Sequence, residues 1–319
     1  MVAASRQHIP VPERAEAAER AEAPQRARRV DIGSRTFDIA ARALVMGICN
    51  RTPDSFFDQG AYFDFDSFLA RVDAIAGEGA DIIDVGGVKA GPGPEVGEQE
   101  ELDRVVPAIV EIRRRFDLCV SVDTWRASVA REAFAAGAVI GNDISGFADS
   151  AYLTEAAAAG ATVVATHIRL RPRVPDPEPF YDDLLGEVGG FLLDRARQAA
   201  GVGIPPERVI IDAGLDLGKT AEQSLELLRA SDRLAQLGYP LLLSASNKRF
   251  LGDVLHLEIG ERRNASLAAA ALGITRGCRI VRAHDVAATV KVRDALEAVL
   301  SLRLDADSDP RAGNLAASR

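Results

Sequence analysis

The sequence predicts an α/β protein folded as a (β/α)8 (TIM) barrel, on two observations. Eight short runs rich in Val, Ile and Leu alternate with longer helix-like segments, which is typical of βα units and a parallel sheet. Each run becomes polar at its C-terminal end, and in a closed barrel these ends meet on one face. An open doubly wound sheet uses fewer strands and carries a G-x-G-x-x-G turn after its first strand, which is missing here.

The eight predicted strands share an apolar beginning, as expected of strands that are buried on both faces. They are ALVMGICN (43–50), DIIDVGG (81–87), LCVSVDT (118–124), VIGNDIS (139–145), TVVATHI (162–168), VIIDAG (209–214), LLLSAS (241–246) and IVRAHD (280–285). Ahead of them, residues 28–42 alternate around Gly33, which predicts a short N-terminal hairpin closing the bottom of the barrel.

The two ends of the chain differ in composition from the part between them. Residues 1–28 are rich in Ala, Glu and Arg and lack side chains that could anchor to a core, and residues 305–319 are similar. We therefore expect disordered tails at 1–28 and 305–319, with a single barrel domain at 29–304. The overall composition, 47% hydrophobic and 27% charged, is that of a globular protein with a buried core.

Charge and cysteine usage exclude several classes of function. The net charge of −9 and a pI near 5.1 give no broad attraction to nucleic acid or to an anionic membrane surface, so neither is expected as a partner. No stretch approaches the ~20 apolar residues of a membrane helix. The three cysteines are an odd number without metal-type spacing. Together these features predict a soluble, cytoplasmic protein.

Polar side chains gather at the predicted strand ends: Asp123, Asn142, Asp212, Lys248, Arg282 and His284. Bringing such groups into a barrel mouth costs free energy unless they pair with one another or with a ligand, and the sequence leaves both readings open. A carboxylate and an amide that face a flat cavity suit a planar heterocycle with an amino-pyrimidinone edge, because this edge presents adjacent N–H donors. A guanidinium can stack on such a ring, and an ammonium can meet its carbonyl oxygen.

A second group of residues suits an anion. Arg282 and His284 alternate along one strand, so their side chains point to the same face and could receive a phosphate. The first strand runs into NRTPDSFFDQG (50–60), which is either a plain turn or a mobile lid. As a lid, it would carry Asn50 as a ligand for phosphate or Mg²⁺, which prefers oxygen ligands and often shares them with substrate phosphates.

Several motifs carry a resemblance to a known family. They are MGICNRTPDSFFDQG, DIIDVGG, SVDT, GNDISG, His167, IIDAGLDLGKT, SNKRFLG and VRAHDV. In this order they resemble dihydropteroate synthase, a (β/α)8 pterin-binding enzyme, over residues 30–300. The resemblance implies that the amine of p-aminobenzoate displaces pyrophosphate from the methylene of 6-hydroxymethyl-dihydropterin pyrophosphate, with Mg²⁺ on the leaving group.

The resemblance also implies roles for the residues at the strand ends. Asp123, Asn142, Asp212 and Lys248 would hold the pterin, and Arg282 would stack on it. In an active enzyme Asp123 and Lys248 would be the catalytic residues, since a buried carboxylate suits the stabilisation of a cationic pterin methylene.

On the same basis, Asn50, Arg282 and His284 would bind the pyrophosphate, and Asn50 would hold its Mg²⁺. The implied ligands are a pterin and p-aminobenzoate or its analogues. The family is often dimeric, so the resemblance also implies a homodimer.

The loop after the second strand departs from the family pattern. Where the family usually reads G-G-E-S-T-R-P-G, the chain has GGVKAGPG, so that Val88, Lys89, Ala90 and Gly91 replace four functional positions. Gly91 in place of Arg removes a bidentate phosphate clamp, a charge-assisted hydrogen bond worth roughly 1.5 to 3 kcal/mol. Lys89 offers a substitute charge, but as a point charge on a flexible stem it does not reproduce the planar fork of a guanidinium.

Smaller departures fall on the same side of the site. Arg51 stands where the family has Val, Asn247 where it has Arg, and Ala213 where it has Pro. Beyond His167, the loop IRLRPRVPDPEPF (168–180) is basic at its start, at residues 169–173. This loop is either an ordinary solvated segment or a cavity mouth rebuilt for a different anion.

The sequence is compatible with three functions. The hypothesis we favour is a pterin-binding protein of folate metabolism, similar to dihydropteroate synthase, with weak or absent synthase activity because of the loop at 88–91. The first alternative is a working synthase in which Lys89 and Arg51 replace the lost cation. The second is a non-catalytic regulatory or interaction barrel.

Overall fold

The computed structural model describes residues 28–52, 64–91 and 93–307, with side chains to residue 300. Residues 1–27 and 308–319 of the expected tails, and residues 53–60 of the expected lid, lie outside this range. The barrel is confirmed: eight parallel strands close in the order β10-β3-β4-β5-β6-β7-β8-β9. They are β3 Leu44–Ile48, β4 Ile82–Gly86, β5 Cys119–Asp123, β6 Ile140–Asp143, β7 Thr162–Thr166, β8 Val209–Asp212, β9 Leu241–Ser244 and β10 Cys278–Ala283.

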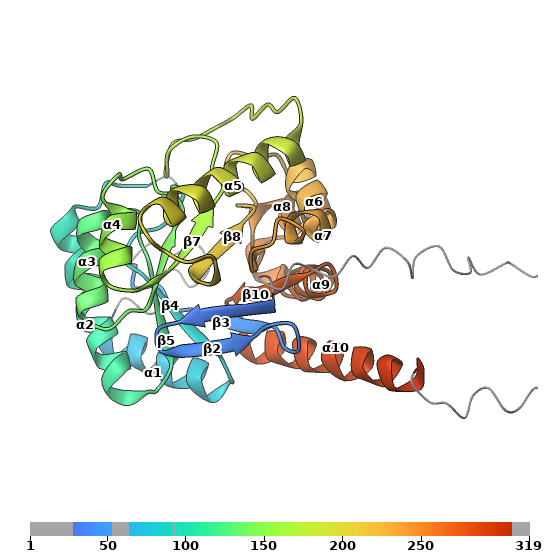
Figure 1. The fold of residues 1–319 in the computed structure, drawn as a ribbon, viewed down its shortest axis with the longest axis horizontal. Coiled ribbons are helices and arrows are strands. Elements are labelled where there is room, and N and C mark those ends of the chain that lie inside the picture. Colours follow the sequence, from blue (N-terminus) through green and yellow to red (C-terminus); the bar gives the residue numbers. More distant parts are fainter. Residues whose placement is uncertain (1–27, 53–63, 92, 308–319) are drawn as a thin grey trace, which may run out of the picture.

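Helices surround the strands on the outside (Figure 1). They are α1 Phe65–Gly77, α2 Glu98–Arg115, α3 Ala127–Ala135, α4 Tyr152–Ala158, α5 Leu184–Gly201, α6 Ala221–Arg229, α7 Ser231–Ala235, α8 Arg249–Leu255, α9 Arg263–Thr275 and α10 Val286–Asp307, with short 3-10 turns at Pro206–Arg208 and Ile259–Glu261. Helix α10 continues through residues 305–307, three positions into the segment expected to be a tail.

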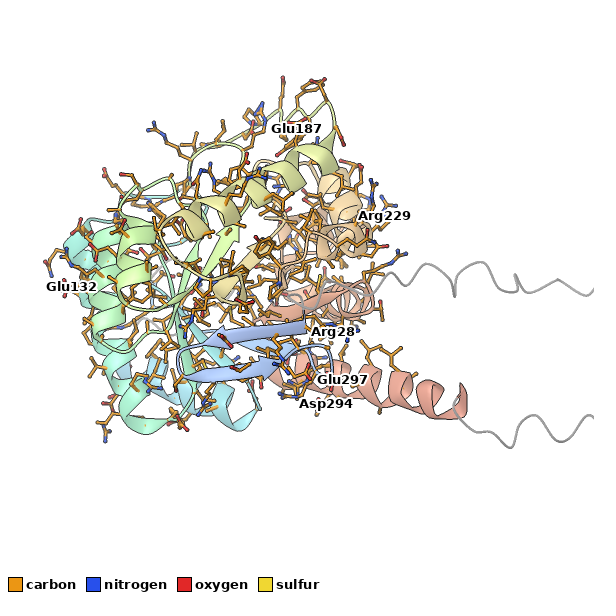
Figure 2. All side chains as sticks on the ribbon, viewed as in Figure 1. Arg28, Glu132, Glu187, Arg229, Asp294 and Glu297 are labelled. Atoms are coloured by element: carbon orange, nitrogen blue, oxygen red, sulfur yellow. The ribbon has the colours of Figure 1, made fainter. Side chains whose placement is uncertain are left out.

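Two layers of apolar side chains hold the barrel, because successive strand residues point to opposite faces. Val45 of β3 points outward and packs with Val72 and Ile75 of α1 in the layer between strands and helices. Its neighbours Leu44 and Met46 lie in a second cluster with residues of the other seven strands, which fills the lower interior of the barrel. The outer helices carry exposed charged side chains, as Figure 2 shows for Glu132, Glu187 and Arg229.

The predicted hairpin is also confirmed. Strands β1 (Arg29–Ile32) and β2 (Arg35–Asp38) pair antiparallel, and Gly33 supplies the positive φ of 59° that the turn needs. Val30 and Ile32 are fully buried and belong to the lower interior cluster of the barrel. The hairpin therefore closes the bottom of the barrel, opposite the carboxyl ends of its strands.

The outer helices bear on the expected homodimer and on the expected absence of a membrane partner. Helix α9 packs against α10 and β10 as an outer helix of the barrel, and the homodimer implied by the resemblance stays a prediction. Within residues 28–52, 64–91 and 93–307, no helix is long and apolar enough to cross a membrane.

All three cysteines are buried, and burial raises the pKa of the Cys119 and Cys278 thiols.

The buried hairpin makes a prediction about stability. Val30→Ala is expected to lower the free energy of unfolding by about 2 kcal/mol, because two buried methyl groups are lost and a cavity remains. Val110, which is 51% exposed on α2, offers the matched control: Val110→Ala should change it by no more than about 0.5 kcal/mol. Equilibrium urea denaturation measures both, and equal losses in the two variants would refute the assignment of the hairpin to the core.

Candidate functional site

A cavity of about 360 Å³ opens at the carboxyl ends of the strands, and we call it the mouth cavity. Its walls include every residue that the sequence singled out for ligand or metal binding: Asn50, Asp123, Asn142, Asp212, Lys248, Arg282 and His284. They come from six of the eight strands or from the loops that follow them. The barrel thus brings together side chains as much as 234 positions apart in the chain, from Asn50 to His284.

Arg282 of β10 is the centre of the polar network. Its Nε donates to Asp84 Oδ2 at 2.6 Å, and its Nη2 donates to Asp123 Oδ2 at 2.7 Å. Asn142 Nδ2 donates to the same Asp84 oxygen at 3.2 Å. An internal ion-pair network, one of the two readings of the sequence, is therefore present for these residues. Because two carboxylates hold its edge, Arg282 keeps its planar face and Nη1 for other contacts.

The ionisable groups at the base of the mouth cavity have lost most of their water. Burial, with a further contribution from Asp84, raises the pKa of Asp123 to about 7, although Arg282 opposes this shift. Burial also raises the pKa of Asp212 and lowers that of Lys248. A ligand that offers donors to these carboxylates would compensate for part of that desolvation cost.

Asp212 and Lys248 have hydrogen-bonding capacity left over. Asp212 Oδ1 accepts from the backbone N–H of Gly214 at 2.8 Å, and Lys248 Nζ donates to the Leu215 carbonyl at 2.6 Å. Among the described residues these are their hydrogen bonds, which leaves Asp212 Oδ2 and two ammonium protons for a ligand.

Asn50 is placed to offer an oxygen to a cation or to a donor. Its Oδ1 is buried and accepts no hydrogen bond from the part of the chain that the structure describes. The same oxygen lies 2.6 Å from the point where a β-carbon on Gly86 would stand, so only glycine fits at position 86. Within the described ranges, no three His, Cys, Asp or Glu side chains are grouped to hold a metal. One protein oxygen nevertheless fits Mg²⁺, which usually keeps several waters and takes further oxygens from substrate phosphates.

His284 sits on the rim of the same cavity as a neutral imidazole. Its Nδ1 lies 3.0 Å from Ser246 Oγ, and its own backbone carbonyl accepts from Arg71 Nη2 at 2.6 Å. Burial, with repulsion from Arg282, lowers the pKa of His284 to about 3. The ring therefore offers an anion hydrogen bonding but no positive charge at neutral pH.

The loop after β4, whose residues 88–91 differ from the family pattern, forms one wall of the mouth cavity. Val88 is buried, and Lys89 reaches back so that its Cε lies 3.7 Å from the position of a β-carbon on Gly91. Lys89 is among the residues that line the cavity. Arg51 is not among them: its Nη1 donates to the α2 carbonyls of Asp103 and Arg104 at 3.1 and 3.2 Å. Of the two cations suggested to replace the lost Arg, only Lys89 faces the site.

The path of this loop is set by arginines outside it. Arg104 Nη1 donates to the Gly87 carbonyl and Arg126 Nη2 to the Val96 carbonyl, each at 2.7 Å. Arg173, from the basic loop after β7, donates to the Pro94 carbonyl at 2.5 Å. The segment between Gly87 and Val96 is thus held at both ends.

Sequence reasoning missed four charged residues of the mouth cavity or its network, namely Asp84, Asp216, Arg249 and Arg262. Asp84 carried a signal, since an ionisable residue inside the apolar strand DIIDVGG requires a buried partner. Arg262 carried none: it follows a 3-10 turn, and its Nη1 reaches the carbonyl of Asn247 at 3.3 Å. A guanidinium therefore stands beside the position where Asn247 replaces the family's Arg.

His167, the polar end of β7, supports the site from outside the cavity. Its Nδ1 lies 2.8 Å from Lys219 Nζ, which also donates to the Gly214 and Leu217 carbonyls at 2.9 and 3.0 Å. Lys219 is buried, and burial with repulsion from Lys248 lowers its pKa to about 7. The pair fixes the loop after β8, which carries the carbonyl that holds Lys248.

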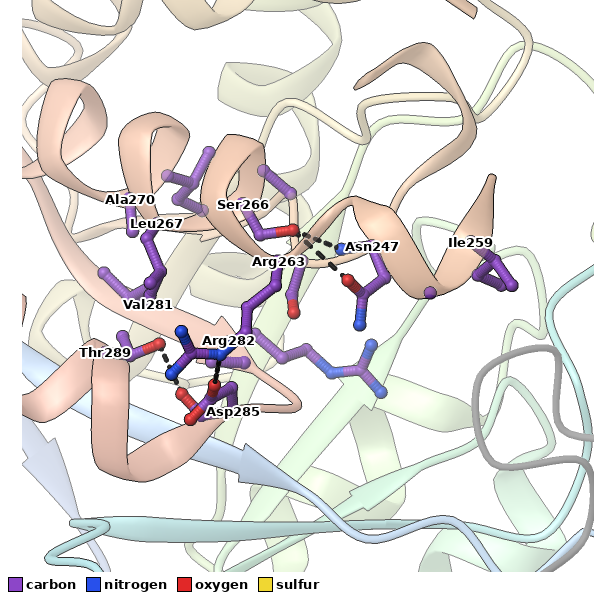
Figure 3. A pocket seen from close by; sticks show the side chains of 15 residues that line it. Asn247, Ile259, Arg263, Ser266, Leu267, Ala270, Val281, Arg282, Asp285 and Thr289 are labelled. Atoms are coloured by element: carbon purple, nitrogen blue, oxygen red, sulfur yellow. Dashed lines mark hydrogen bonds and ion pairs between the residues drawn. The ribbon is translucent and has the colours of Figure 1, made fainter. Parts of the chain in front are cut away.

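A smaller hollow of about 130 Å³ lies behind β9 and β10, beneath α9 (Figure 3). Its polar groups are already paired: Arg263 Nε donates to Asp285 Oδ2 at 2.6 Å, and Ser266 Oγ accepts from the Asn247 backbone N–H at 2.9 Å. Arg282 extends away from the Arg263–Asp285 pair in this view. We therefore place the candidate site in the mouth cavity.

Most of the chain is similar to known proteins of a single family. The family model described as "Pterin binding enzyme" matches residues 46–284. An "Inactive dihydropteroate synthase 2" from Mycobacterium leprae is 42% identical over 272 residues, covering 83% of this chain and 93% of that protein. The "Dihydropteroate synthase" of Haemophilus influenzae is 39% identical over 246 residues, covering 77% of this chain and 90% of that protein.

Solved structures that resemble this chain belong to the same family. The dihydropteroate synthase of Yersinia pestis, in a complex with a sulfonamide drug, aligns with a TM-score of 0.82 at 35% identity, over 86% of this chain and 99% of that one. The enzyme from Xanthomonas albilineans, with 4-aminobenzoic acid, aligns with a TM-score of 0.78 at 37% identity, over 87% and 98%. Since barrel, motifs and relatives coincide over most of its length, the chain belongs to the pterin binding enzymes, within the dihydropteroate synthase family.

Proposed function

We propose that this member of the family binds a reduced pterin in the mouth cavity and has weak or absent synthase activity. The observation that carries the proposal is the contrast between two walls of one cavity. Asp123, Asn142, Asp212 and Lys248 converge on its base, whereas the loop wall at 88–91 has neither the hydroxyl nor the guanidinium of the family pattern.

The base of the cavity suits the pterin for chemical reasons. Asp212 has a free carboxylate oxygen for the ring's adjacent N–H donors, and Lys248 has ammonium protons for its carbonyl oxygen or a ring nitrogen. Arg282, fixed edge-on by two carboxylates, offers its face for stacking on the ring. Asp123 lies on the same wall, where its charge would stabilise a developing positive charge on the pterin methylene.

The leaving-group side of the site is less complete. Asn50 would hold Mg²⁺, which when bound supplies positive charge that stabilises the leaving pyrophosphate. Arg282 and His284 would contact the phosphates, but Arg282 is already shared between two carboxylates and His284 is neutral. The missing Arg at position 91 therefore removes a cation that these neighbours do not replace in full.

The relatives support both parts of this proposal. Their printed ligands, a sulfonamide drug and 4-aminobenzoic acid, support a small aromatic ligand for this chain. The mycobacterial relative is named inactive, and it matches as closely as relatives named as synthases. We further propose a cytoplasmic location, which the buried thiols of Cys119 and Cys278 support because reducing compartments keep cysteines as thiols.

A working synthase is the second candidate, and one observation favours it. Lys89 lines the mouth cavity, with its side chain folded across Gly91, so that a cation does face the place of the lost Arg.

Pterin binding itself is tested by Asp212→Asn. Replacing the charged acceptor is expected to weaken the binding of a dihydropterin about 10- to 100-fold, since a hydrogen bond to a charged group contributes roughly 1.5 to 3 kcal/mol. Isothermal titration calorimetry measures the dissociation constant. Asp194→Asn, an exposed change on α5, should leave it unaltered. Undiminished binding by the Asp212 variant would refute this placement of the pterin.

The proposal that the altered loop limits synthase activity is tested by restoring the family's residues at positions 89–91. The triple variant Lys89→Ser, Ala90→Thr, Gly91→Arg is expected to turn over pterin pyrophosphate and p-aminobenzoate with Mg²⁺ at least tenfold faster than the native chain. The native chain should remain below about 1 per second, the lower range of ordinary enzymes. Native turnover above that rate, with no gain from the restored loop, would show that the altered residues do not limit the reaction.

The second candidate predicts a different result for Lys89→Ala. If Lys89 replaces the lost cation, this variant should lose at least tenfold in turnover and in pyrophosphate affinity while its pterin affinity stays the same. Lys291→Ala, an exposed lysine change on α10, is the matched control. Equal turnover in the two variants would exclude the compensating role of Lys89.

A further inference from the structure

A second and larger cavity adjoins the mouth cavity. It measures about 710 Å³, and we call it the outer cavity. The basic, proline-rich loop after β7, the loop after β8 and the first turn of α8 form its walls. It shares Ala90, Gly91, Asp216, Leu217 and Arg249 with the mouth cavity, so the two spaces meet along these residues.

The meeting point is open because the side chains there are small. A β-carbon built on Gly91 has one neighbour within 4 Å, the Cε of Lys89 at 3.7 Å. The side chain of an Arg at this position, as in the family pattern, would stand in space that Ala90 and Gly91 leave empty. With Ala and Gly at these positions, the two cavities meet here.

The outer cavity is lined by two arginines, Arg171 and Arg173, that form no ion pair with its described acids. Arg171 is exposed, and its guanidinium makes no hydrogen bond or ion pair with any described residue. Arg173 uses Nη2 for the Pro94 carbonyl and retains its other nitrogens. Arg173 is also held at a φ of 65°, an unusual backbone conformation for a bulky residue, which fixes the bend that carries both arginines.

Three of the four acids that line the outer cavity have partners of their own. Asp176 pairs with Arg169 at 2.9 Å, and Asp253 pairs with Arg249 at 3.0 Å. Asp216 accepts from the backbone N–H of Phe250 at 3.2 Å. Glu222 lies in the first turn of α6, where the helix dipole favours its charge. Arg171 and Arg173 are therefore the charges that remain for an anion.

We infer that the outer cavity binds the acidic tail of an extended ligand, whose pterin end occupies the mouth cavity and whose chain passes at Ala90 and Gly91. This inference rests on the proposed function. The ligand class is a pterin–arylamine conjugate with carboxylates beyond the aryl ring. The apolar side chains of Leu170, Val174 and Leu217 line the outer cavity and suit the aryl part, and Arg171 and Arg173 suit the carboxylates.

The test compares two ligands that differ only in the tail. Dihydropteroate ends in an aryl carboxylate, and dihydrofolate continues into a glutamate. Calorimetric titration of the native chain at low salt should show dihydrofolate binding at least tenfold more tightly. The ratio should shrink as salt is raised, because exposed charge pairs are screened.

Two variants locate the effect. Arg171→Ala should lower the preference for dihydrofolate, whereas Arg131→Ala, an exposed arginine change on α3, should keep it. Gly91→Leu should abolish it by filling the passage without adding charge, and Gly91 does not have the left-handed backbone that would exclude a side chain. Thermal melting followed by circular dichroism shows that each variant is folded.

The outcomes separate this inference from the proposed function. Equal affinity for the two conjugates, with a dihydropterin still bound, would overturn the tail site and leave pterin binding intact. A preference that persists in Gly91→Leu would overturn the passage. Failure of the native chain to bind a dihydropterin would overturn both.

Discussion

The site depends on one buried interaction, the guanidinium of Arg282 held between the carboxylates of Asp84 and Asp123. These three side chains come from β10, β4 and β5, and none could stay charged so deep in the barrel without the others. Removing one partner would leave an uncompensated buried charge. The network therefore fixes the base of the mouth cavity in the geometry that the proposed ligand requires.

Around this base the remaining groups are arranged by backbone contacts. Lys219 and His167 hold the loop after β8, and that loop supplies the carbonyl that holds Lys248. Gly86 leaves room for the amide of Asn50. The hairpin closes the lower end of the barrel. Of the residues proposed to contact the pterin, Asp123, Asn142, Asp212 and Arg282 lie on strands, whereas the altered residues 88–91 lie in a loop.

The fold could be predicted from the sequence because its signal is local. Each of the eight strands is an apolar run with a polar end, and the alternation around Gly33 marks the hairpin. That the seven residues proposed for ligand or metal binding lie in one cavity could be predicted for the same reason, since strand ends converge in a barrel.

Other parts of the site could not be read from the sequence, because they depend on contacts between distant residues. Arg282 and Asp84 are 198 positions apart, and the direction in which Arg51 points depends on the carbonyls of α2. Nothing in the sequence around Arg262 shows that it reaches Asn247. The union of two cavities at Gly91 follows from the absence of a side chain, which becomes visible only once its surroundings are placed.

The anchoring of the loop after β4 has a consequence for how this protein can change over generations. Arg104, Arg126 and Arg173 hold the loop by carbonyl oxygens, and every amino acid has one. Mutations between these anchors alter the chemistry that the loop presents and leave the carbonyl groups that anchor it in place. A lineage can therefore lose one activity and explore ligands here with little cost in folding, while the base of the barrel stays as it was.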